Sequence, residues 1–167
     1  MEQAGIIGPD ENYELIEGEI VPMQAKNDPH ERVKSAIIFE LAPALRGGPL
    51  WIGLETSLRL SDNTMLEPDF CVYNKALRLR EVRGPDILLA IEVSDSSLWF
   101  DKGRKARLYA GFGVHELWVV NANTLVTTIH RRPGAEGWAE VSDHPGTERI
   151  APATFPGFAI SVAEAMA

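Results

Sequence analysis

Two short apolar runs constrain the fold of this chain most strongly, because each of them carries a carboxylate. Asp69 lies in the run from Met65 to Tyr73, and Glu92 lies in the run from Ile87 to Ser94. Apolar runs of this length are typical of strands buried in a sheet. An ionised carboxylate in such a strand is costly unless a cation or hydrogen-bond donors pair with it. The alternative is that both carboxylates sit at strand ends and face water.

The spacing of apolar and turn residues predicts a mixed α/β (α+β) fold, with a central sheet between helices. The length of 167 residues fits a single domain over 1–167. The expected strands are a hairpin with arms Tyr13 to Ile16 and Ile20 to Met23, then Leu50 to Leu60, Met65 to Tyr73, Ile87 to Ser94, Glu116 to Val120, Leu125 to His130 and Thr147 to Ala151. The expected helices are one that Asp28 caps and Gly47 ends, one over Leu98 to Ala110, and a short one after the turn at Phe155 to Phe158.

Composition narrows the class of protein. The net charge of −8 argues against a surface that binds nucleic acid everywhere, although local basic groups such as Lys102 to Arg107 are present. The single cysteine, Cys71, allows no intrachain disulfide. No run approaches the length of a membrane span, and the N-terminus lacks a signal pattern. We therefore expect a cytoplasmic protein with no membrane partner.

The residues available for catalysis are Asp69, Glu92 and Lys105. Hydrolysis of a phosphodiester needs a divalent cation, which takes oxygen ligands, and a lysine that stabilises the developing charge. The main-chain carbonyl of Val93 is a further candidate ligand. Asp101 and Tyr109 are each four residues from Lys105 and share its helical face. Asp101 either positions Lys105 or only caps the helix.

In their order along the chain these residues resemble the PD-(D/E)xK nuclease superfamily. More closely, the chain resembles the Uma-type (Uma2) restriction-endonuclease-like family. The motifs that carry the resemblance are Tyr13 to Val21, His30, Glu67-Pro68-Asp69, Ile91-Glu92-Val93-Ser94, Asp101 to Val114, Glu116 to Val120 and Phe155 to Phe158. The resemblance implies a restriction-endonuclease-like core with an N-terminal hairpin, Mg²⁺ (or Mn²⁺) as cofactor, and DNA as partner.

One position departs from the superfamily pattern, which places a lysine two residues after the glutamate. Ser94 stands there instead. The family resemblance moves the lysine to the following helix, at Lys105, and Lys102 is the competing residue. Glu19 matches a Gly-Glu pattern of the family and is a possible third metal ligand or an exposed hairpin residue. His30 either supports the site or simply occupies the first helical turn.

We therefore expect a magnesium-dependent endonuclease that hydrolyses phosphodiester bonds in DNA. The alternative is a non-catalytic module on a nuclease fold that binds nucleic acid or protein, which the acidic charge favours. A homodimer is also expected, since such nucleases often use two subunits to cut two strands. The residues that bind nucleic acid cannot be named from the sequence.

Overall fold

A six-stranded mixed sheet forms the centre of the computed structural model, which describes residues 13–23, 26–155 and 157–167. The strand order is β10-β9-β8-β7-β6-β3, and every neighbouring pair is antiparallel except β7 and β8. The strands are β3 (Leu50–Leu54), β6 (Phe70–Asn74), β7 (Ile87–Ser94), β8 (Glu116–Asn121), β9 (Thr127–Gly134) and β10 (Gly137–His144). The predicted mixed α/β architecture is confirmed.

A smaller sheet in the order β2-β1-β5-β4 lies beside the central one. It contains the predicted N-terminal hairpin, β1 (Tyr13–Ile16) and β2 (Glu19–Pro22), whose turn has positive φ at Glu17 and Gly18. The short strands β4 (Leu58–Arg59) and β5 (Met65–Leu66) complete it. Because β5 leads directly into β6, this sheet brings the hairpin close to Asp69.

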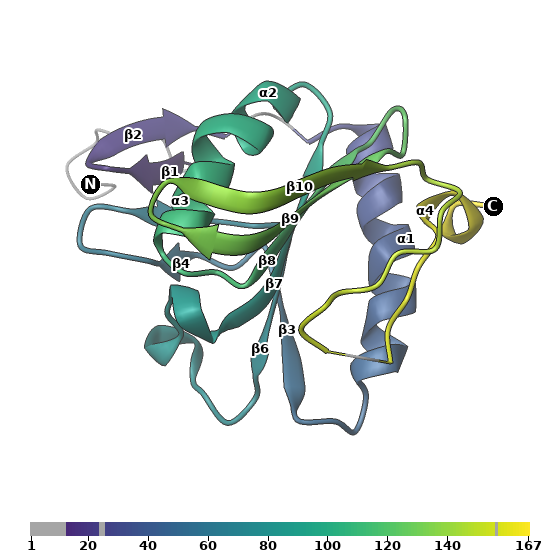
Figure 1. The fold of residues 1–167 in the computed structure, drawn as a ribbon, viewed down its shortest axis with the longest axis horizontal. Coiled ribbons are helices and arrows are strands. Elements are labelled where there is room, and N and C mark those ends of the chain that lie inside the picture. The colour runs from purple at the N-terminus through teal and green to yellow at the C-terminus, as the bar shows by residue number, and fades with distance from the viewer. Residues whose placement is uncertain (1–12, 24–25, 156) are drawn as a thin grey trace.

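Helices cover both faces of the central sheet (Figure 1). On one face lie α1 (Asp28–Leu45) and α4 (Val162–Ala165). On the other, a continuous helical segment consists of α2 (Leu98–Phe100), the π-helical turn η4 (Asp101–Lys105) and α3 (Ala106–Gly111). Short 3₁₀ turns, η2 (Leu79–Glu81) and η3 (Gly84–Asp86), precede β7. The cap of α1 is Asn27, one residue before the expected Asp28, and its side chain accepts a hydrogen bond from the His30 N–H.

Alternate residues of the central strands divide the core into two clusters. The outer cluster, under α1 and α4, includes Phe70, Val72, Leu89, Ile91 and Trp118. The inner cluster, under the α2–η4–α3 segment and the small sheet, includes Cys71, Tyr73, Ala90, Tyr109 and Leu117. Cys71 is buried and free, as a small apolar side chain would be, and burial raises the pKa of its thiol to about 12.

Three expected strands were wrong. The run from Met65 to Tyr73 forms two strands, β5 in the small sheet and β6 in the central one, and Asp69 lies in a bend just before β6. Residues 50–60 do not form one strand, because Glu55 has a φ of 45° and the chain there passes from the central sheet to the small one. Residues 147–151 contribute only an isolated bridge between Ile150 and Ile160. The strand expected from Leu125 begins at Thr127, and β10 was not predicted at all. Of the expected turn at residues 155–158, Pro156 lies outside the described residues.

No helix in the described part of the chain is long and apolar enough to cross a membrane.

Candidate active site

Asp69 and Glu92 share one face of the central sheet. Phe70 of β6 pairs with Ile91 of β7, so the next opposed positions along the antiparallel pair are Asp69 and Glu92. The Val93 N–H donates to Asp69 Oδ2 at 2.8 Å, which fixes the aspartate against the neighbouring strand. Asp69 is 5% exposed and Glu92 is 4% exposed. Neither carboxylate therefore faces open water.

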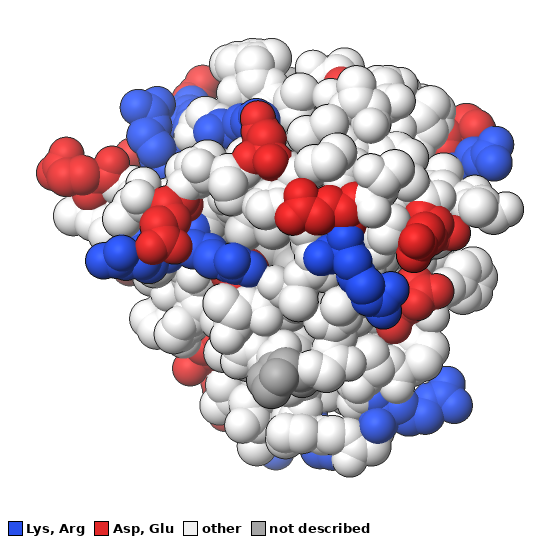
Figure 2. All heavy atoms as spheres, turned by 45° about the vertical axis from the view of Figure 1, so that its right-hand side comes forward, with Lys and Arg blue, Asp and Glu red and all other residues white. Residues whose placement is uncertain are grey.

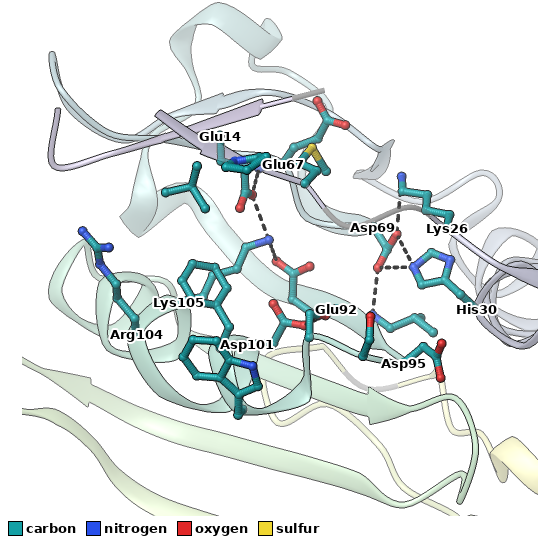
Figure 3. Close-up of a pocket in the computed structure, with 18 of the residues that line it drawn as sticks. Glu14, Lys26, His30, Glu67, Asp69, Glu92, Asp95, Asp101, Arg104 and Lys105 are labelled. Atoms are coloured by element: carbon teal, nitrogen blue, oxygen red, sulfur yellow. Dashed lines mark hydrogen bonds and ion pairs between the residues drawn. The ribbon is translucent and has the colours of Figure 1, made fainter. Parts of the chain in front are cut away.

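Lys105 reaches Glu92 from the helical segment above the sheet. Its ammonium lies 2.9 Å from Glu92 Oε1 and 2.8 Å from Glu14 Oε1 (Figure 3). The Tyr109 hydroxyl, one turn further along, donates to Glu92 Oε1 at 2.5 Å. The π-helical turn places Lys105 here, because the Ala106 N–H bonds back to the Asp101 carbonyl and the turn holds an extra residue.

Buried charge dominates the electrostatics around Glu92. Burial raises the pKa of Glu92 well above its usual value; the Lys105 ammonium opposes this shift, whereas the charges of Asp101, Asp69 and Glu14 add to it. Burial by itself would lower the pKa of Lys105, but the charges of Glu92, Glu14 and Asp101 outweigh burial and raise it. Lys105 therefore remains an ammonium. Burial, together with the charges of Glu92 and Glu14, also raises the pKa of Tyr109, which stays a neutral donor.

Asp101 is held by hydroxyl groups. Ser94 Oγ donates to Asp101 Oδ2 at 2.7 Å, and Ser97 Oγ donates to the same oxygen at 2.5 Å. Asp101 is 5% exposed, so it is not an ordinary surface residue. Ser94, which stands where the superfamily pattern has lysine, therefore links the end of β7 to the helical segment that carries Lys105.

His30 contacts Asp69 from the opposite side. Its Nε2 lies 3.2 Å from Asp69 Oδ2, and its Nδ1 lies 3.1 Å from Glu31 Oε1. Burial alone would lower the pKa of His30, but its contacts with Asp69 and Glu31 raise the pKa overall. The Lys26 ammonium lies 3.9 Å from Asp69 Oδ1. In Figure 3 Asp69, His30 and Lys26 form one half of the site, and Glu14, Lys105 and Glu92 form the other.

Most of these side chains line one cavity of about 460 Å³, namely Glu14, Lys26, His30, Asp69, Glu92, Asp101 and Lys105. Its floor is acidic, because Glu14, Asp69, Glu92 and Asp101 all line it and Lys105 is the buried ammonium among them. The walls come from β2 and the residues after it, from α2 and η4, and from the start of α1. The remaining lining residues are Glu19, Val21, Pro22, Met23, Glu67, Val93, Asp95, Ser96, Ser97, Trp99, Phe100 and Arg104.

Two of the expected candidates point elsewhere. Lys102 lies 3.3 Å from Asp143 of β10, whereas Lys105 lies at Glu92. Glu19 lines the cavity, but its carboxylate is directed to Arg104, with Oε2 2.7 Å from Nη1. Within residues 13–23, 26–155 and 157–167, no three His, Cys, Asp or Glu side chains are arranged to hold a metal ion.

Glu14 is the site residue that sequence reasoning missed. It is 5% exposed, and Oε1 accepts the Glu67 N–H at 2.7 Å in addition to its contact with Lys105. The available signal was the one that singled out Asp69 and Glu92, namely a carboxylate within the apolar strand from Tyr13 to Ile16. Its place in a hairpin far from the other motifs concealed it.

A mixed sheet with one carboxylate just before β6, a second within the adjacent β7, and a lysine on the helical segment that follows defines a restriction-endonuclease-like protein. The chain belongs to the Uma2 family, whose model, described as "Putative restriction endonuclease", matches residues 1–163. A similar solved structure is the crystal structure of a "putative nuclease belonging to DUF820" from Anabaena variabilis. Its TM-score is 0.76 at 14% identity, over 99% of this chain and 95% of that one, so the likeness concerns the fold. A search of the curated proteins finds no match.

Proposed function

We propose that this protein is a divalent-metal-dependent endonuclease that hydrolyses phosphodiester bonds in DNA. Its membership of a family described as restriction endonucleases supports a nuclease. The observation that carries the proposal is that Asp69, one residue before β6, accepts the Val93 N–H next to Glu92 of β7, with Lys105 2.9 Å from Glu92, at the floor of a cavity.

The donor set fits a hard divalent cation. Four buried carboxylates and one buried ammonium line the cavity floor, which therefore carries an excess of negative charge. Magnesium takes one or two carboxylates and completes its shell with water and substrate oxygens, and a site of three protein side chains is not required. Asp69, Glu92 and the Val93 carbonyl would hold Mg²⁺ or Mn²⁺. The Val93 carbonyl points to the same side of β7 as the N–H that Asp69 accepts.

When bound, the cation would polarise the phosphodiester and lower the pKa of the attacking water. The remaining residues bind the phosphate or orient the side chains that contact the cation. Lys105 presents an ammonium that stabilises negative charge on a phosphate oxygen. Tyr109 holds Glu92, and His30 holds Asp69, each by a hydrogen bond to the carboxylate. Asp101 anchors the start of the segment that carries Lys105 through Ser94 and Ser97. Glu19 is given no ligand role, because Arg104 neutralises it.

Cleavage of plasmid and single-stranded circular DNA tests the proposal, with Mg²⁺ or Mn²⁺ and with a chelator. We expect cleavage by the wild type with metal only, and its loss in Asp69→Asn and Glu92→Gln, which keep the side-chain shape. Lys105→Met should lose activity while Lys102→Met, whose ammonium lies at Asp143, should keep it. Absence of metal-dependent cleavage by the folded wild type would favour a non-catalytic binding module.

A further inference from the structure

Trp99 is 78% exposed at the mouth of the cavity described above. Its neighbours in α2, Leu98 and Phe100, pack against the inner cluster. The three-residue helix therefore turns two apolar side chains inward and presents an indole to the solvent. A single exposed apolar side chain is ordinary, but Trp99 differs from the exposed Phe39 and Trp51 because it lines the cavity that holds the carboxylates.

The indole of Trp99 contacts the ring of the neighbouring Phe100. The rings of Trp99 and Phe100 meet edge to face, with centroids 5.7 Å apart and planes at 71°. Because Phe100 is itself packed on the inner cluster, this contact restricts the motion of Trp99. A restricted aromatic side chain loses little entropy when a ligand stacks on it. Trp99 therefore has the properties of a preformed stacking surface.

The rest of the cavity indicates what would stack. Val21, Pro22 and Met23 add apolar lining, while the cations Lys26 and Arg104 are each paired with carboxylates, Lys26 with Glu55 and Arg104 with Glu17 and Glu19. The carboxylates and Lys105 lie at the floor. The proposed nuclease function puts a phosphate at the carboxylates and Lys105, and the apolar lining with Trp99 suits the flat base of the same nucleotide unit when that base is free to stack.

Stacking on Trp99 favours a single strand. The carboxylates are only 4–5% exposed, so a phosphate must enter the cavity to reach them, which brings the neighbouring base to the cavity lining. In an intact duplex the bases are stacked on one another, so a base could stack on Trp99 only after extrusion, which costs roughly a few kcal/mol per base. The net charge of −8 and the interspersed acidic and basic side chains on the face in Figure 2 also suit a short contact better than a long duplex footprint.

We infer that Trp99 stacks on a base of single-stranded DNA and that single-stranded DNA is the preferred substrate of this site. The inference rests on the proposed nuclease function, which it makes more specific. Trp99 acts here in binding and selection of the strand, while the reacting phosphate lies at the carboxylates and Lys105.

The test measures binding of a fluorescently labelled strand of about 12 nucleotides, and of its duplex, by the full chain with chelator at one fixed salt concentration. The variants are Trp99→Ala, the conservative Trp99→Phe, and the matched control Trp51→Ala. Trp51 is 58% exposed and lines a different surface hollow, beside Tyr73 and Lys75. Thermal melts verify that each variant is folded.

We expect Trp99→Ala to weaken single-strand binding about tenfold, Trp99→Phe to stay within about threefold, and Trp51→Ala to match the wild type. The wild type should bind the single strand more tightly than the duplex. Equal binding by Trp99→Ala and wild type, or a preference for duplex, would overturn the inference. Cleavage of the same DNA with Mg²⁺ separates the two proposals. Cleavage of duplex alone, unaffected by Trp99→Ala, would leave the nuclease proposal standing and overturn this one. Trp99-dependent binding of the single strand without any cleavage would overturn the nuclease proposal and leave the stacking role of Trp99 standing.

Discussion

The ammonium of Lys105 lies 2.9 Å from Glu92 Oε1, and neither side chain is more than 6% exposed. The same ammonium lies 2.8 Å from Glu14, so one buried cation compensates two buried carboxylates. Isolated buried charges are expensive, whereas paired ones are tolerated. The arrangement around Lys105 is therefore a determinant of stability as well as a candidate for chemistry.

Lys105→Met should destabilise the protein strongly, by about 3–5 kcal/mol at neutral pH, because Glu14 and Glu92 lose their shared partner. Lys102→Met is the matched control. Its ion pair with Asp143 is largely exposed, so we expect a loss below about 1 kcal/mol. Urea unfolding of both variants measures the difference. Similar midpoints for the two would contradict the burial-based account of Lys105.

Glu92→Gln should stabilise the protein at neutral pH, although it removes an ion pair. A raised pKa means that the folded state binds the proton more tightly than the unfolded state does. The stability that the protonated Glu92 contributes is fully present below about pH 4.5, and it is lost as pH rises through the folded-state pKa of Glu92. Each pKa unit corresponds to about 1.4 kcal/mol. The difference in the free energy of unfolding between Glu92→Gln and wild type should therefore grow from about pH 5 to about pH 8. Urea unfolding at several pH values in that range measures this difference.

Glu116 provides the control for that measurement. It is fully buried on the other face of the sheet, where it accepts hydrogen bonds from Trp118, Arg131 and the Ala153 N–H. Glu116→Gln replaces these charge-assisted hydrogen bonds with neutral ones and should lower the free energy of unfolding by about 1–3 kcal/mol. If both glutamine variants changed stability in the same direction, the distinction between a strained site carboxylate and a satisfied structural one would be wrong.

His30→Gln should lower stability mainly at acidic pH. The contacts of His30 with Asp69 and Glu31 raise its pKa despite burial, so the protonated ring stabilises the folded state. This contribution is present below about pH 6.5, the ordinary pKa of histidine, and disappears as pH rises through the raised pKa. We expect a deficit of about 1–2 kcal/mol at pH 6 that shrinks by pH 9. An equal deficit at pH 6 and pH 9 would contradict this account of His30.

Local sequence patterns predicted the elements that carry the site. The run that became β7 was predicted with its observed ends, Ile87–Ser94, because apolar residues fill it and turn residues bound it. The N-terminal hairpin, the long first helix and β8 followed from equally local signals. The pairing of β6 with β7 then places Asp69, one residue before β6, opposite Glu92.

What the sequence did not predict depends on contacts between distant segments. β10 consists largely of exposed residues and is held by backbone pairing with β9, so no apolar alternation marks it. At the break in the expected strand, Glu55 pairs with Lys26 and Lys34, and no local pattern reveals these contacts. The ion pair of Glu14 with Lys105 joins the first strand to a late helical turn. The diversion of Glu19 to Arg104 is a similar long-range contact.

Magnesium should raise the melting temperature of the wild type and leave that of Asp69→Asn nearly unchanged. A ligand that binds only the folded state stabilises it, by about 2.7 kcal/mol when its free concentration is a hundred times its dissociation constant. Asp69→Asn removes one of the two carboxylates proposed to hold the cation and keeps the shape that accepts the Val93 N–H. Asp143→Asn is the matched control, because Asp143 is an exposed aspartate paired with Lys102 and should respond to magnesium as the wild type does. Thermal melts with and without magnesium compare the three proteins. An equal magnesium shift in all three would place the cation elsewhere, and the carboxylates at the cavity floor would then serve binding or stability.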